Sequence, residues 1–155
     1  MLRFGFLLCV FAFIPLAANA QDEKVTPGQA HLRQLDVLIG TWERTTSNGE
    51  TERATCEWIN NKSYIQFTVG DFREIIGWDL KQSAITSWGF GSHGGQGKAD
   101  WVKEGDVWKV SVNWLNRWGK EVPVWRTIKV DGDTMEVTWS YGGHKTAFQS
   151  KRVDE

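Results

Sequence analysis

The sequence contains few cysteines and no excess of either charge. Only two of its 155 residues are cysteines, and Cys9 lies in an N-terminal segment that we expect to be removed. Cys56 then has no intramolecular partner, which excludes a disulfide scaffold. Its alternation with Ala54 and Trp58 favours a small buried residue, with a catalytic or redox thiol as the alternative. The 18 basic and 19 acidic residues nearly balance, so the composition provides no attraction for nucleic acid.

Histidines are equally scarce. His31, His93 and His144 lie too far apart in the sequence for a metal-binding motif. No Gly-x-Ser-x-Gly, His-Glu-x-x-His or paired-cysteine pattern is present either. We therefore expect no metal and no cofactor. A hydrolase that uses His93 as a general base is kept as an alternative.

A long apolar run occurs at the N-terminus, where Arg3 precedes the stretch from Phe4 to Leu16 and Ala18-Asn19-Ala20 follows it. This order is typical of a Sec-type signal peptide. The run is shorter than the ~20 residues of a membrane span, and Pro15 interrupts it, so we expect cleavage after Ala20 and no stable membrane anchor. The sequence thus predicts a signal peptide over residues 1–20 and a secreted or periplasmic protein. Its remaining residues, 21–155, suit one domain.

Ten tryptophans dominate the rest of the chain. Many of them alternate with polar residues, as in the series Trp108, Val110, Val112 and Trp114. A period of two is typical of a half-buried strand. The pattern therefore predicts an all-β domain with an aromatic interior.

A short helix over 27–38 is predicted by the stripe of Leu32, Leu35 and Leu38. About ten strands follow it, and turn residues such as Gly142-Gly143 join them. A meander of this length, without helices to cover a second face, avoids open edges by closing on itself, so we predict an antiparallel up-and-down barrel. The expected strands are 41–47, 51–58, 62–69, 72–79, 84–91, 97–103, 107–115, 122–130, 134–141 and 144–152.

The chain resembles lipocalin-type, or calycin, barrels at Gly40-Thr41-Trp42, where a short helix leads into the first strand. A closer similarity is to an uncharacterised family of secreted bacterial calycin-like domains, similar to domains sometimes found beside SnoaL-like domains. That family offers no established activity. In calycins the motif tryptophan commonly lies under an arginine of the last strand, so the resemblance implies that Arg152 stacks on Trp42. The stretches that carry the similarity are Leu35–Glu43, Cys56–Trp58, Ile75–Asp79, Ser87–Ser92 with Gly94-Gly95, and Trp101 with Trp108.

The same resemblance adds one cofactor alternative. Some related barrels bind haem through a late histidine, a role that His144 beside Gly142-Gly143 would fill here. A histidine in a loop is more often solvated, and the sequence has no other sign of a haem pocket.

Side-chain alternation predicts which residues face the lumen. The predicted residues include many large aromatic side chains, which favours a filled lumen or a narrow cavity for one small ligand. The predicted set is Ala54, Cys56, Trp58, Ile65, Phe67, Val69, Ile76, Trp78, Trp88, Phe90, Trp101, Trp108, Val110, Val112, Trp114, Val124, Ile128, Val130, Met135, Val137 and Trp139.

Two charged residues share lumen-facing positions. Arg126 lies between Val124 and Ile128, and Glu74 precedes Ile76 by the same alternation. A charge inside a barrel must find a partner. One interpretation is structural, in which Arg126 pairs with Glu74, lies near a rim or is turned outward by a bulge. The functional interpretation is capture of a ligand carboxylate by the planar guanidinium, as in the fatty-acid-binding barrels that this chain resembles.

The segment from Gly89 to Lys98 is rich in glycine but is not a phosphate loop. Ser92 stands where the first glycine is required, Ala99 stands where Ser or Thr is required, and the segment joins two strands. Its glycines predict bends at a barrel corner. Alternatively, they let a ligand approach the backbone, with His93 at the mouth.

These observations predict a barrel that binds a small apolar or amphipathic molecule, including one that bears a carboxylate. Trp118, between two cationic neighbours in a hairpin tip, is expected to be exposed and to form a contact surface. A lumen of ~300 Å³ or more would favour ligand binding. The alternatives are a carbohydrate-binding module with exposed tryptophans, a small hydrolase-like enzyme, and an interaction domain without a ligand. The expected ligand contacts are Arg126, Trp88, Phe90, Trp114, Trp139, Tyr141, His93 and Trp118.

Overall fold

The computed structural model of the protein describes residues 25–46 and 48–154. The predicted signal peptide, with Cys9, lies outside these described residues. Among the described residues, no helix is both long and apolar enough to cross a membrane.

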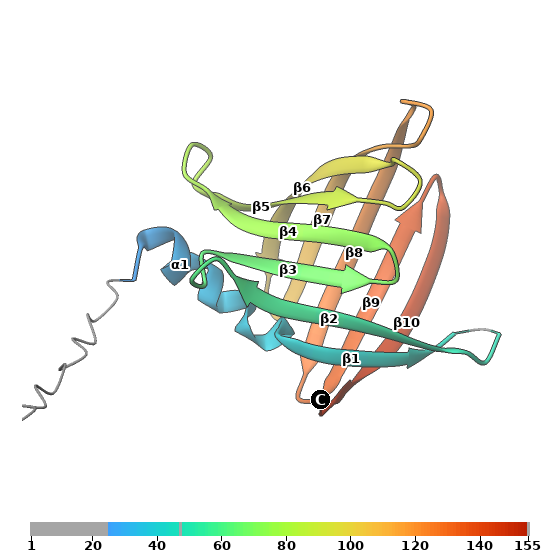
Figure 1. Ribbon diagram of the computed structural model, residues 1–155, viewed down its shortest axis with the longest axis horizontal. Coiled ribbons are helices and arrows are strands. Elements are labelled where there is room, and N and C mark those ends of the chain that lie inside the picture. Colours follow the sequence, from blue (N-terminus) through green and yellow to red (C-terminus); the bar gives the residue numbers. More distant parts are fainter. Residues whose placement is uncertain (1–24, 47, 155) are drawn as a thin grey trace, which may run out of the picture.

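The described chain forms a closed antiparallel barrel in which each strand pairs with its neighbours in sequence and the first pairs with the last. This confirms the predicted up-and-down barrel with one short helical segment, and the strand ends differ from the expected ones by at most two residues. Figure 1 shows the strands wrapping around the lumen. They are β1 (Gly40–Thr45), β2 (Thr51–Ile59), β3 (Tyr64–Val69), β4 (Phe72–Asp79), β5 (Ala84–Phe90), β6 (Gln96–Glu104), β7 (Val107–Leu115), β8 (Glu121–Asp131), β9 (Thr134–Tyr141) and β10 (His144–Val153).

The helical segment consists of α1 (Pro27–Leu32) and a 3₁₀ turn, η1 (Arg33–Leu38). The sequence favours a helix start here because Thr26 and Gln29 form a reciprocal capping box and Pro27 occupies the first turn. Ile39 then returns the backbone to an extended conformation that leads directly into β1.

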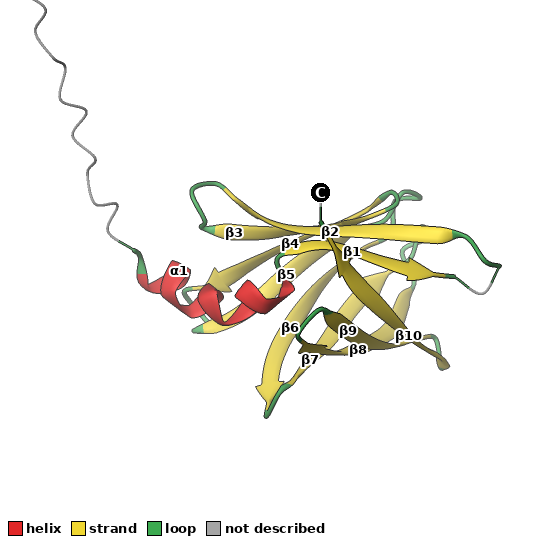
Figure 2. Cartoon of the chain, turned by 90° about the horizontal axis from the view of Figure 1, so that it is seen from below, coloured by secondary structure: helices red, strands yellow, loops and turns green. Residues whose placement is uncertain are grey.

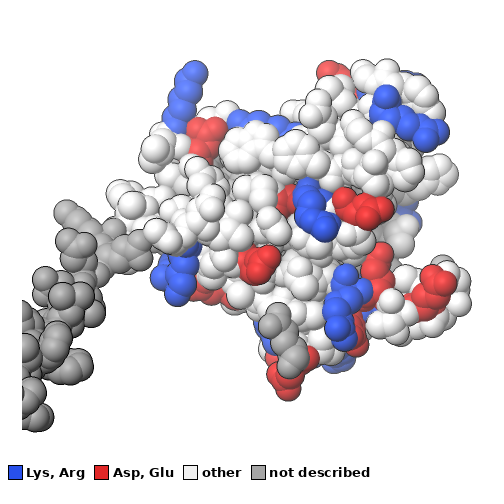
Figure 3. Space-filling view, viewed as in Figure 1, with Lys and Arg blue, Asp and Glu red and all other residues white. Residues whose placement is uncertain are grey.

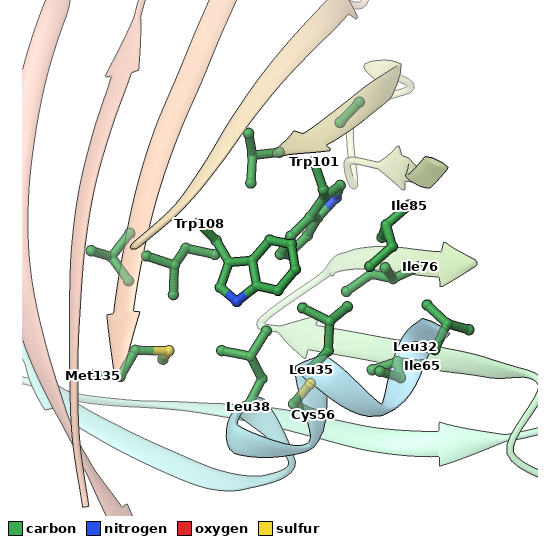
Figure 4. Packing of buried hydrophobic residues seen from close by; sticks show 14 of the residues in the cluster. Leu32, Leu35, Leu38, Cys56, Ile65, Ile76, Ile85, Trp101, Trp108 and Met135 are labelled. Atoms are coloured by element: carbon green, nitrogen blue, oxygen red, sulfur yellow. The ribbon is translucent and has the colours of Figure 1, made fainter. Parts of the chain in front are cut away.

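The helical segment covers one end of the barrel (Figures 1 and 2). Leu32 and Leu35 are completely buried, and Leu38 nearly so. Figure 4 shows these three leucines pointing toward side chains of the barrel interior. A ring stack and a hydrogen bond also fix the segment in place. The His31 ring stacks on Trp78 with 3.8 Å between centroids, and Trp58 Nε1 donates to Asp36. The buried core therefore lies at this covered end.

The opposite end of the barrel, which we call the mouth, carries the hairpins that follow the odd-numbered strands. Because consecutive strands are antiparallel, the β1–β2, β3–β4, β5–β6, β7–β8 and β9–β10 connections all lie there. The β9–β10 connection is a tight turn in which Gly142 and Gly143 have φ values of 56° and 89°. Such positive φ values favour glycine, as the sequence predicted.

The seam between β1 and β10 is closed over only part of its length. Three residue pairs join these strands, from Thr41↔Val153 to Glu43↔Lys151, whereas β9 pairs with β10 along its whole length, to the His144 end at the mouth. In Figure 1 the two strands diverge beyond the paired part. The barrel ladder is therefore incomplete on the mouth side of this seam.

Charged side chains of both signs are interspersed on the face shown in Figure 3. Several form ion pairs on the outer surface, among them Glu43 with Arg53 and Glu104 with Lys109. Isolated exposed pairs of this kind contribute little to stability.

Candidate functional site

The barrel encloses a cavity of about 390 Å³. Trp139 lines it and is still 42% exposed, so the cavity reaches solvent at this ring. Leu38 and Trp42 line it at the covered end, where both are buried. The other lining residues are Arg44, Glu52, Ala54, Cys56, Phe67, Val69, Phe72, Glu74, Ile76, Gly89, Gly97, Ala99, Trp101, Val112, Trp114, Val124, Arg126, Ile128, Met135, Val137, Tyr141, Phe148 and Ser150.

Most of the predicted lumen residues line this cavity, and four of the expected ligand contacts do so. Arg126, Trp114, Trp139 and Tyr141 come together there from β7, β8 and β9. Three predicted lumen tryptophans lie elsewhere, at the covered end. Trp108 is buried in the core, while Trp58 and Trp78 pack against its edge beneath the helical segment.

The prediction that Trp88 and Phe90 face the lumen is wrong. Both are exposed on the outside of β5, and the small residues that alternate with them, Ser87 and Gly89, face inward instead. The reason is the Trp114 ring of β7, which occupies the space next to Gly89 and Gly97: a Cβ at Gly97 would lie 2.9 Å from Trp114 Cε3. The glycines of this segment therefore accommodate a neighbouring side chain, and the bulky rings of β5 point to solvent.

Glu74 and Arg126 form an ion pair that spans the lumen between β4 and β8, as predicted. Arg126 Nη2 donates to both carboxylate oxygens of Glu74 at 2.6 Å. The side chains are 4% and 15% exposed, so the pair is largely removed from water. Ser87 also donates to Glu74 and accepts a hydrogen bond from Trp101 Nε1, while the Arg126 guanidinium lies 5.0 Å from the centre of the Trp101 ring. The buried carboxylate is thus fully engaged by protein groups.

Arg126, by contrast, keeps unused donor capacity. Both of its hydrogen bonds leave from one nitrogen, Nη2. Its Nε is buried without a hydrogen-bond partner, and no residue in the described part of the chain accepts from Nη1 either. Nη1 is not fully buried, and Arg126 lines the cavity.

A second ion pair, which the sequence interpretation missed, lies at the open part of the seam. Arg44 of β1 pairs with Glu52 of β2, and its guanidinium lies 3.7 Å from the centre of the Phe148 ring of β10. The alternation that placed Ala54 inside also places Glu52 inside, and Arg44 stands two residues after Trp42. That alternation was the signal that could have found this pair.

Cys56 lines the cavity as a free, buried thiol. Burial, reinforced by the nearby Glu74 carboxylate, raises the pKa of this thiol from 9.0 to about 12. The thiolate is the nucleophile and the redox-active form. At neutral pH Cys56 is therefore a small apolar side chain, which favours the structural interpretation over the catalytic one.

The predicted contact between Trp42 and Arg152 is present at the covered end. The Arg152 guanidinium lies 4.2 Å from the centre of the Trp42 ring, and Arg152 also donates to the backbone carbonyls of Val37 and Ile39. Gly40 has φ of 132°, and a Cβ there would lie 2.7 Å from Arg152 Nη1. Glycine at this position therefore leaves the room that the arginine needs.

The remaining predicted contacts belong to the loops at the mouth. Trp118 is 74% exposed, as expected, and Arg117 stacks on its ring at 4.1 Å. His93 is exposed and bonds to its neighbour Ser92, and His144 is exposed at the start of β10. None of these three residues lines the cavity. The described residues contain no group of three or more His, Cys, Asp or Glu side chains that could hold a metal ion.

No model of a known protein family matches this chain, and no curated protein sequence is significantly similar to it.

Proposed function

We propose that the protein binds one small, largely apolar or amphipathic molecule inside the barrel. The observation that carries this proposal is the cavity of about 390 Å³, which falls within the range of ~300–1,000 Å³ typical of ligand pockets. Burial of the guest's apolar surface stabilises the complex by about 25 cal/mol per Å².

The composition of the lining supports the same proposal. Aromatic and aliphatic side chains dominate it, and Arg126 provides a polar group with an unpaired donor. Few polar groups on an apolar wall are the usual arrangement by which a pocket orients a ligand. In contrast, the histidine proposed as a general base, His93, lies outside the cavity.

Export by a signal peptide over residues 1–20 is part of the proposal, as is membership of the calycin-like family. Both rest on the sequence patterns at Arg3–Ala20 and Gly40–Trp42. A binding protein in the periplasm or outside the cell is consistent with a barrel that holds its guest out of water.

Titration with 1-aminoanthracene, an uncharged dye that fluoresces in apolar surroundings, tests the proposal. We expect one dye molecule to bind per chain. Ala54 lines the cavity, so Ala54→Phe places a ring in the space and should weaken binding at least about tenfold, which corresponds to about 1.4 kcal/mol.

The matched control is Ala147→Phe, which adds the same ring at an exposed position of β10. It should leave dye binding within about twofold of the wild type. The proposal fails if the folded wild type binds no dye, or if both substitutions affect binding equally.

A further inference from the structure

The charges inside the barrel are balanced pair by pair. Glu74 pairs with Arg126, and Glu52 pairs with Arg44. The lining contains no other Asp, Glu, Lys or Arg side chain among the described residues. The lumen therefore offers a guest no net charge of either sign.

This balance disfavours a charged guest. A carboxylate beside Arg126 would also lie beside Glu74, whose two oxygens already accept from that arginine at 2.6 Å. Attraction to Arg126 and repulsion from Glu74 then nearly cancel, whereas the ligand carboxylate still loses its favourable hydration. An ammonium group meets the same balance with the signs reversed.

An uncharged acceptor meets a different environment. Arg126 lines the cavity, and its Nη1 is not fully buried and has no hydrogen-bond partner in the described part of the chain. A carbonyl or hydroxyl oxygen can accept from it without disturbing Glu74, and bonds from charged donors are stronger than those from neutral ones. Because the carboxylate of Glu74 compensates the charge, the guanidinium acts as a hydrogen-bond donor rather than as an anion receptor.

We infer that the ligand is an uncharged molecule whose apolar body fills the cavity and whose carbonyl or hydroxyl oxygen accepts a hydrogen bond from Arg126. This inference rests on the proposed function and specifies the chemical class of its ligand. An arginine without a paired carboxylate would instead select a ligand that bears a carboxylate.

Displacement of bound 1-aminoanthracene by three unbranched ligands, each with ten carbon atoms, tests the inference. The ligands are 2-decanone, decanoate and decylammonium, compared at neutral pH below the concentrations at which the ions form micelles. We expect 2-decanone to displace the dye at concentrations about tenfold lower than either ion requires.

A charge-neutralising variant should then change the preference. Glu74→Gln keeps the size of the side chain and leaves Arg126 uncompensated, so decanoate should displace the dye at least about tenfold more effectively than from the wild type. The effect of 2-decanone should stay within about twofold. Glu43→Gln, in the outer pair with Arg53, is the matched control and should alter neither ligand.

The outcomes separate this inference from the proposed function. If decanoate displaces the dye from the wild type as well as 2-decanone does, the inference is overturned while ligand binding stands. An unchanged preference in folded Glu74→Gln overturns it as well. Failure of the wild type to bind the dye at all rejects the proposed function and this inference with it. Circular dichroism checks the folding of Glu74→Gln, and if that variant does not fold, the order of ligands on the wild type decides alone.

Discussion

Glu74 and Arg126 depend on each other inside an otherwise apolar lumen. Removing one member of a buried ion pair typically costs about 3–5 kcal/mol, because the other charge is left without a partner. Replacing both members by apolar residues is often neutral or stabilising. Net stability therefore does not explain why two charges meet in this lumen, whereas the hydrogen bond to a ligand that we propose for Arg126 would.

Cys56 should make stability depend on pH in the alkaline range. Its native pKa is raised from 9.0 to about 12, chiefly by burial, so the unfolded chain loses this proton at a lower pH than the native protein does. The contribution is complete below pH 9 and is lost as pH rises from there toward 12, by up to about 1.4 kcal/mol per pH unit.

Urea unfolding at about pH 8, 9.5 and 10.5 measures this slope. We expect the free energy of unfolding of Cys56→Ala to fall less steeply than that of the wild type over this range, because the difference isolates the thiol from other groups that titrate there. Equal slopes in the two proteins would show that the native thiol ionises at its ordinary pH.

At the level of elements, β5 and β6 are shaped by the Trp114 ring of β7. A Cβ at Gly97 would lie 2.7 Å from a backbone oxygen of Asn113, whereas a Cβ at Gly91 would make ordinary contacts at 3.4 Å or more. We therefore expect Gly97→Ala to lower the free energy of unfolding by about 1–3 kcal/mol. Gly91→Ala, the matched control, should change it by no more than about 0.5 kcal/mol. Thermal unfolding of both variants checks this, and equal losses would contradict the steric argument.

The strands were predictable from sequence, but which side chains of β5 face the lumen was not. Alternation and turn residues place each strand within two residues because both signals are local. In β5 the bulky residues Trp88 and Phe90 alternate with small ones, and the local pattern alone predicted that the bulky residues face the lumen. The opposite holds because Trp114, a residue of another strand, takes the inner space beside Gly89. The site pair Glu74–Arg126 was predictable because each residue alternates with apolar neighbours, whereas their detailed hydrogen bonding depends on the closed barrel.

At the level of the whole molecule, Arg152 connects the last strand to the end of the helical segment and to β1. It stacks on Trp42 and donates to the carbonyls of Val37 and Ile39, so it holds the helical segment against the barrel end. We expect Arg152→Ala to lower the free energy of unfolding by about 2–4 kcal/mol, from a cation–π contact of ~0.5–2 kcal/mol and charged hydrogen bonds of ~1.5–3 kcal/mol that partly overlap.

Lys151→Ala is the matched control for Arg152→Ala. Lys151 is the preceding residue of β10 and is exposed, and among the described residues its side chain donates only to Thr134. Its loss should cost less than about 1 kcal/mol in urea unfolding. If the two substitutions cost the same, Arg152 does not fasten the barrel end.

The short ladder between β1 and β10 closes this seam by backbone pairing only toward the covered end of the barrel. Beyond Glu43 and Lys151, the contact across the seam is made by the Arg44 side chain resting on Phe148 rather than by paired backbone. Side-chain rotations take picoseconds to nanoseconds when a residue is exposed, whereas parting a strand ladder requires local unfolding. For the ligand binding that we propose, opening this part of the seam therefore requires one side chain, Arg44, to leave Phe148 and its partner Glu52, while every strand ladder stays paired. Exchange of a bound molecule would then follow the loss of one ion pair and one ring contact rather than local unfolding of the barrel.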